Sequence, residues 1–166
     1  NRNQAIKFYE KSDEGNKDLD EDIYAERLGK QFTSKPINDE FKFILHVKNL
    51  IKQKKLKDAE EMLKDVLAEN KYSNRAKSES YLLLSDIYLM NKKFEDALEQ
   101  ALLCIKLNAS KDNTIAANSY YKAALALVNL NREDEAIGYL DKIEQTDDFD
   151  FQTTLKNKAY TLRRKI

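Results

Sequence analysis

The side chains best suited to chemistry in this sequence are its single cysteine, Cys104, and its single histidine, His46. A thiolate beside an imidazole is a nucleophile with its base, and clusters of both residue types bind zinc. One residue of each type cannot form a zinc cluster. Both fall within helical segments, so we interpret Cys104 as a small packed residue and His46 as a core or edge histidine.

Carboxylates and glycines point to no reaction either. Adjacent acids such as Glu60–Glu61 and Asp147–Asp148 occur routinely on helical surfaces. Three scattered glycines cannot build a phosphate-binding loop. We therefore expect a chain that is not an enzyme, with no catalytic residue, no metal site and no cofactor.

Composition indicates a helical chain without an attraction for polyanions. Twenty-nine basic residues balance 29 acidic ones among 166 residues, and the chain has only three Gly and one Pro. A neutral chain has no overall field for nucleic acid, and the basic stretch 48–57 lacks interleaved aromatic residues. No run approaches 18 apolar residues, so no membrane span is expected. The chain opens without Met, and we expect it to be a trimmed or partial sequence that carries no compartment signal.

An internal repeat is the strongest signal. The segments "KKLKDAEEMLKDVL", "KKFEDALEQALLCI" and "LNREDEAIGYLDKI" align on Ala59, Ala97 and Ala136, which are 38 and 39 residues apart. A second helical segment precedes each of them. Only two or three residues separate the two segments of each pair, which predicts antiparallel helices.

Apolar residues in these segments recur at helical steps of three and four, which predicts one buried face per helix. The predicted core residues, in order of the three repeats, are Phe43, Val47, Leu50, Leu56, Ala59, Leu63, Val66; Tyr81, Leu84, Tyr88, Phe94, Ala97, Ala101, Cys104; and Tyr120, Ala123, Ala124, Leu127, Ala136, Leu140, Ile143.

The pattern resembles the tetratricopeptide repeat, a helix-turn-helix unit of 34 residues. The family's large aromatic residue in the first helix matches Phe43, Tyr81 and Tyr120, and its alanine in the second helix is matched in all three repeats. The resemblance implies an all-α, right-handed superhelical solenoid of antiparallel hairpins at about residues 40–70, 77–108 and 114–146.

This chain departs from the family pattern at the turns. The family's turn glycine is replaced by Lys54, Lys92 and Asn131, and its closing proline is absent. Asparagine tolerates the left-handed conformation that ends helices. We therefore expect the asparagines near the helix ends to adopt it, namely Asn70, Asn91, Asn108 and Asn131.

Both ends of the chain differ from the repeats. Residues 1–39 are expected to hold a partial repeat helix at 1–12, an acidic loop at 13–22 and a helix of one to three turns within 23–32, with Asn38 or Asp39 capping the next helix. Residues 150–166 form an amphipathic stripe through Leu155, Ala159 and Leu162, which predicts a capping helix. The alternative is the first helix of a fourth repeat.

In the tetratricopeptide family the first helices of successive repeats line a concave groove. The resemblance places these residues there: Phe41, Ile44, Lys48 and Ile51; Glu79, Leu82, Asp86, Leu89 and Met90; and Asn118, Tyr121, Lys122, Leu125 and Val128. Many are apolar, so we expect an apolar groove that docks a peptide or an amphipathic helix of a partner protein. The alternatives are packing in a homodimer and filling by the chain's own segments, such as Ile23–Phe32.

The predicted function is therefore a protein-interaction scaffold within a larger assembly. The alternative is a ligand- or peptide-sensing regulatory domain of a multidomain protein.

Overall fold

The computed structural model describes residues 7, 11, 19–34, 37–108 and 112–166, and the regular elements of this part are helical, with no strand. Helix α2 spans Asp20–Ser34. It is followed by α3 (Asp39–Lys52), α4 (Leu56–Ala68), α5 (Asn74–Met90), α6 (Phe94–Asn108), α7 (Asn113–Asn129), α8 (Glu133–Glu144) and α9 (Gln152–Arg163). The helix expected within residues 1–12 and most of the acidic segment lie outside the described residues.

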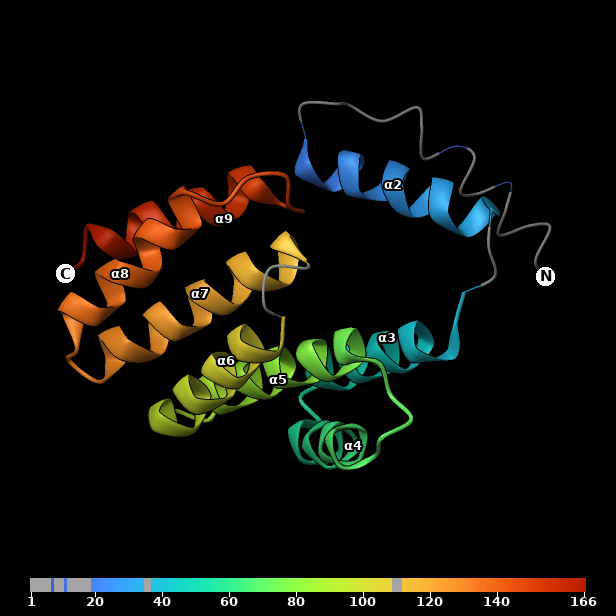
Figure 1. The fold of residues 1–166 in the computed structure, drawn as a ribbon, viewed down its shortest axis with the longest axis horizontal. Helices are drawn as coiled ribbons and strands as arrows, with labels where there is room; N and C mark the ends of the chain where they lie inside the picture. The colour runs from blue at the N-terminus through green and yellow to red at the C-terminus, as the bar shows by residue number, and fades with distance from the viewer. Residues whose placement is uncertain (1–6, 8–10, 12–18, 35–36, 109–111) are drawn as a thin grey trace.

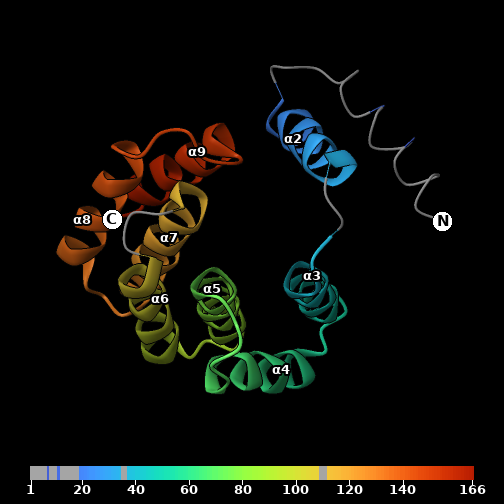
Figure 2. The same ribbon diagram turned by 45° about the vertical axis from the view of Figure 1, so that its right-hand side comes forward.

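From α3 onward, each helix packs against the next one in the chain, and the helices form two layers. Helices α3, α5, α7 and α9 pack side by side in the inner layer, whereas α4, α6 and α8 cover them from outside. Among the described helices, those of the outer layer make no packing contact with one another. Figure 2 shows the inner layer as an arc. Each outer helix also packs against the inner helix that follows it, so successive pairs are joined both within the inner layer and between the two layers.

The three hairpin turns share one backbone conformation. Lys54, Lys92 and Asn131 have φ of 62°, 58° and 58°. In the middle turn the Lys92 amide donates to the Leu89 carbonyl (3.1 Å) and the Lys93 amide donates to Tyr88 (2.9 Å). The other two turns repeat this pair of bonds, which satisfies the last carbonyls of each first helix.

The expectation that asparagines supply the left-handed residues was correct only for Asn131. Asn91 caps α5 with a φ of −87°, and Asn70 and Asn108 are not among the residues with positive φ. Asn108 is buried, and its side-chain amide donates to the Asp112 carbonyl (2.8 Å). Position in the turn, and not residue type, decides which residue turns the chain.

The core follows the predicted stripes. Ala59, Ala97 and Ala136 have no exposed surface, and one continuous apolar cluster runs from α3 to α9. Phe43, Leu56, Tyr81, Phe94 and Tyr120 are only partly buried. These five large side chains are therefore less buried than the alanines, whose small side chains let the helices approach closely.

Helix α2 is longer than the one to three turns expected. Its 15 residues begin at Asp20, inside the segment expected to be an acidic loop. Asp20, Glu21 and Asp22 occupy the first turn, where carboxylates interact favourably with the positive end of the helix dipole. The acids thus start a helix instead of preventing one.

Candidate functional site: the inner surface

The N-terminal ends of the inner helices are joined by equivalent side chains. Asn38, Ser73 and Asp112 cap α3, α5 and α7, each accepting a bond from a backbone amide of the first turn. The second residue of each helix then reaches the start of the next inner helix, through Glu40 to Ser73 and Arg75 to Asp112.

The third joint uses Thr114, the second residue of α7, whose hydroxyl accepts from the Asp150 amide (3.0 Å) just before α9. The corresponding distances are 2.7 Å from Ser73 Oγ to Glu40 and 2.8 Å from Arg75 to Asp112. This edge of the inner layer is therefore fixed by three polar joints, and its residues Glu40, Arg75, Asp112 and Thr114 border a cavity.

A cavity of about 720 Å³ lies between the inner layer and α2, and we call this space the cavity. Its apolar wall combines residues of the inner helices and of α2, namely Phe41, Ile44, Ala76, Leu82, Leu83, Ile115, Phe151, Tyr24, Leu28 and Phe32.

Charged residues also line the cavity, so the expected apolar groove is in fact a mixed surface. Lys48 of α3 lies 3.5 Å from Glu79 of α5, and Arg75 lies between Glu79 and Asp112. Lys122 of α7 pairs with Asp86 of α5. These pairs join neighbouring inner helices, because residues that face the groove also meet across the helix interfaces. Each of these cations already has an acidic partner.

Helix α2 lies across the open side of the cavity. At one end, the ring of Phe32 packs edge-on against Phe41 of α3, with centroids 5.0 Å apart. At the other end, Tyr24 packs on Phe151 with the same separation, and Arg27 pairs with Asp150. Figures 1 and 2 show α2 between the two ends of the inner layer. Helix α2 therefore bridges the first and last inner helices.

The turn before α9 is shaped for this contact. Asp148 and Phe151 both have a φ of 56°, a left-handed conformation that aromatic residues rarely adopt. The Thr154 amide in the first turn of α9 donates to Asp20 Oδ2 (2.8 Å). Burial of Tyr24, and secondarily the charge of Asp150, raise the pKa of the Tyr24 phenol. This end of α2 thus docks through a ring contact, an ion pair and a helix-end hydrogen bond.

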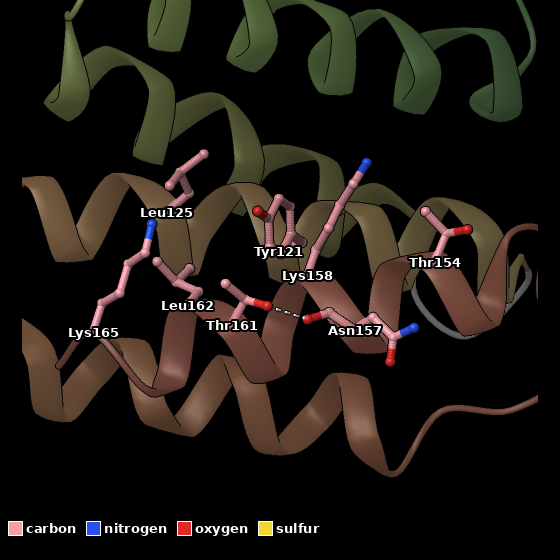
Figure 3. Close-up of a pocket in the computed structure, with 8 residues that line it drawn as sticks. All are labelled: Tyr121, Leu125, Thr154, Asn157, Lys158, Thr161, Leu162 and Lys165. Carbon is pink, nitrogen blue, oxygen red and sulfur yellow. Dashed lines mark hydrogen bonds between the residues drawn. The ribbon is translucent and has the colours of Figure 1, made fainter.

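A second hollow, which we call the channel, lies between α7 and α9 and has a volume of about 450 Å³. Figure 3 shows its lining residues: Tyr121, Leu125, Thr154, Asn157, Lys158, Thr161, Leu162 and Lys165. Burial raises the pKa of the Tyr121 phenol. The Thr161 hydroxyl donates to the Asn157 carbonyl (2.9 Å). The channel therefore combines an apolar base with hydroxyl, amide and ammonium groups.

The residues predicted for the groove fall into three groups. Phe41, Ile44, Lys48, Glu79, Leu82, Asp86 and Asn118 line the cavity. Tyr121 and Leu125 line the channel. Ile51, Leu89, Met90, Lys122 and Val128 line neither.

Position along the helix explains most of the third group. Ile51, Leu89, Met90 and Val128 lie at the C-terminal ends of their helices, beside the hairpin turns, whereas the cavity extends no farther than Lys48 of α3, Asp86 of α5 and Asn118 of α7. Met90 is exposed, and Ile44 is 4% exposed and belongs to the core as well as to the cavity wall. A periodic pattern identifies a face but not how far a groove extends along it.

Several lining residues were not predicted, including Arg75, Asp112 and Thr114. The cavity-facing residues of α2 belong to Ile23–Phe32, which was an alternative occupant of the groove. One signal was available, since Glu40, Arg75 and Thr114 each lie two residues after an N-cap. The pairing of Arg27 with Asp150 joins residues 123 positions apart and has no local signature.

The two residues considered for chemistry have ordinary surroundings. Cys104 is fully buried, its thiol donates to the Ser78 carbonyl (3.1 Å), and burial raises its pKa from 9.0 to about 11. A thiol with this pKa is protonated at neutral pH. His46 is exposed, so its interpretation as a core or edge histidine was wrong on the core side. Its position on α3 faces solvent because Val47 and Leu50 take the buried face.

Within the described residues, no group of three or more His, Cys, Asp or Glu side chains is arranged to hold a metal ion. Across those same residues, no helix has the length and apolar content needed to cross a membrane. No protein-family model matches the sequence, and comparisons with curated proteins and with solved structures found no similar protein.

Proposed function

We propose that this chain is a protein-interaction module that docks a helical segment of a partner on its inner surface, within a larger assembly. We further propose that its helix pairs form a right-handed, tetratricopeptide-like superhelix. The equivalent turns at Lys54, Lys92 and Asn131 and the equivalent joints along the inner edge support a true structural repeat.

The observation that carries the proposal is the position of α2. An amphipathic helix already lies on the inner surface, with aromatic residues at both ends seated against α3 and the start of α9. A surface that accepts a helix of its own chain has the shape and chemistry to accept one from another protein. The proposal gives the chain no catalytic role.

In the test, the wild-type chain and a variant with Leu82→Asp and Leu125→Asp are immobilised, and the proteins that each one captures are compared. Leu82 lines the cavity and Leu125 lines the channel, and neither is fully buried. The variant should lose specific binding proteins that the wild type captures, while its circular dichroism and melting temperature stay close to wild type.

The matched control introduces the same charges at Leu45 and Leu102, which are exposed and line neither hollow. Leu45→Asp with Leu102→Asp should retain the captured proteins. Identical capture by the groove variant and the wild type would contradict the proposal. If the aspartates disturb the fold, Leu82→Ala with Leu125→Ala provides the same comparison without charge.

A further inference from the structure

We propose that α2 is a built-in occupant of the inner surface and that the partner is an amphipathic helix with an acidic N-terminal flank, which displaces α2. This inference rests on the proposed function and specifies both its partner and its regulation. It is carried by the face of α2, by the way α2 is held, by the empty space beneath it and by the charge of the channel.

The residues of α2 that face the cavity have the spacing of an amphipathic helix docked through one face. Tyr24, Arg27, Leu28, Gln31 and Phe32 line the cavity, at steps of three, four, seven and eight residues along one helix face. Ile23 is 47% exposed. A partner helix would place its own anchors at the same spacing.

Helix α2 packs its backbone against little of the two layers. Phe32, at 8% exposure, is its only buried large apolar side chain. The Arg27 side chain is 54% exposed, so its ion pair with Asp150 contributes little to docking. Among the described helices, only α9 packs its backbone against that of α2. Helix α2 therefore has less backbone packing against its neighbours than any helix of the two layers.

The space beneath α2 favours binding of a partner helix over binding of α2. Most protein interfaces are packed without large voids, yet a cavity of about 720 Å³ remains between α2 and the wall formed by Ile44, Leu82 and Leu83. A helix with larger apolar side chains at the positions of Leu28 and Gln31 would bury more apolar surface there. Such a helix should bind more tightly than α2 does.

The channel indicates what precedes the partner's helix. Thr154, which bonds Asp20 at the first turn of α2, is also a channel residue. Figures 1 and 2 show this end of α2 at the start of α9, while its other end lies toward α3. A chain that continues from this end of the bound helix therefore meets the channel.

Lys158 and Lys165 make the channel basic. No acidic residue lines it, and within the described residues neither lysine forms an ion pair. The other cations of the inner surface, Lys48, Arg75 and Lys122, are paired with acids. At 1.5 Å per residue, the lysines lie roughly 6 and 16 Å beyond Thr154 along α9. Acidic residues ahead of the partner's first turn would supply the missing charges.

The probe for the test is a fluorescently labelled synthetic peptide with the sequence of residues 13–34 and Gln31→Leu. It carries acids at positions 13, 14 and 18 ahead of the helix. A second probe has Asn or Gln at these three positions. Binding is measured by fluorescence anisotropy against the full-length chain and against a released variant with Tyr24→Ala, Leu28→Ala and Phe32→Ala. These changes weaken α2 and leave the inner layer intact.

The acidic probe should bind the released variant at least tenfold more tightly than the wild type, and Leu82→Asp in the released variant should abolish binding. On the wild type, probe binding should speed hydrogen exchange in residues 20–34 and not in α5. Equal affinity for both proteins would overturn the role of α2 as an occupant. Absence of binding to the folded released variant would overturn the helical partner, while capture of binding proteins by the immobilised wild type could still succeed.

The charge of the channel is tested in the released variant with Lys158→Glu and Lys165→Glu. This change should weaken binding of the acidic probe at least tenfold and leave binding of the second probe unaffected. The control, Lys55→Glu with Lys57→Glu, makes the same charge change at exposed residues outside both hollows and should have no effect. Equal binding of the two probes to the released variant would overturn the acidic flank.

Discussion

In two of the three hairpin turns, lysine occupies the position with left-handed backbone conformation. Lys54 and Lys92 hold a left-handed conformation that costs an L-residue free energy and costs glycine none. Their hydrogen bonds to the ends of α3 and α5 show that the conformation is required by the turn. The chain therefore gives up stability at these positions.

Lys92→Gly should stabilise the protein by about 0.5–1 kcal/mol, since the relief of left-handed strain exceeds the added entropy of the unfolded chain. Urea denaturation followed by circular dichroism measures the change. Lys92→Ala is the control, because alanine is strained in the same way and should bring no gain. Equal effects of glycine and alanine would show that strain at this position is not the cause.

Cys104 makes stability depend on pH at the alkaline end. Burial raises the pKa of its thiol in the folded protein from 9.0 to about 11. The unfolded chain therefore loses this proton first, so the contribution is complete below pH 9 and is lost as the pH rises from 9 to about 11. The loss amounts to roughly 2–3 kcal/mol.

The measurement compares the free energy of unfolding of the wild type and of Cys104→Ala between pH 8 and 11. Both proteins contain the same tyrosines, so the difference between the two curves isolates the thiol. The wild type should lose more stability than the variant across this range. Parallel curves would mean that the folded protein does not hold the thiol proton more firmly than the unfolded chain.

At the scale of elements, the alanines of the second helices set how closely the helices approach. Ala97 of α6 is fully buried, and its carbonyl accepts from the Ser85 hydroxyl of α5 (2.8 Å). Ala97→Leu should cost on the order of 1–3 kcal/mol through overpacking, measured as a drop in melting temperature. Ala68→Leu, at the partly exposed C-terminal end of α4, is the control. Equal melting temperatures of Ala97→Leu and the wild type would contradict the packing.

The helix pairs and their buried faces could be predicted from the sequence, because helical periodicity reports the burial of each helix directly. The mixed chemistry of the inner surface could not. Lys48, Glu79 and Asp86 appear as isolated charges in the sequence, and only the packing of one inner helix on the next pairs them. The length of α2 was missed because acidity was interpreted as a sign of a loop.

The place of α2 was beyond prediction for a related reason. Ile23–Phe32 was one of several candidates to fill the groove, but its stripe of Tyr24, Leu28 and Phe32 does not say which surface it meets. The surface that α2 meets is formed by Phe41 and Phe151. These two residues are far from each other in the chain and both contact α2 only after the stack has formed.

At the scale of the whole molecule, α2 connects the two ends of the inner layer. Successive pairs are joined by contacts between inner helices and by the packing of each outer helix on the next inner helix, and α2 adds a bridge between the two ends. We expect the two ends of the stack to move apart when the contacts of α2 are removed.

The released variant should therefore have a larger radius of gyration than the wild type by small-angle X-ray scattering, while most of its helicity remains. Ile23→Ala removes an exposed side chain of α2 and is the control, with a radius equal to that of the wild type. An unchanged radius in the released variant would show that the contacts among α3–α9 set the curvature without α2.

The hairpin turns have one more consequence, which concerns proteolysis. Each turn exposes basic residues, Lys54 with Lys55, Lys92 with Lys93, and Arg132 after Asn131. A trypsin-like protease acting on the folded chain would therefore find a site between the two helices of every pair, in addition to the exposed Lys71 between α4 and α5. Cleavage at the three turns would separate the two helices of each pair.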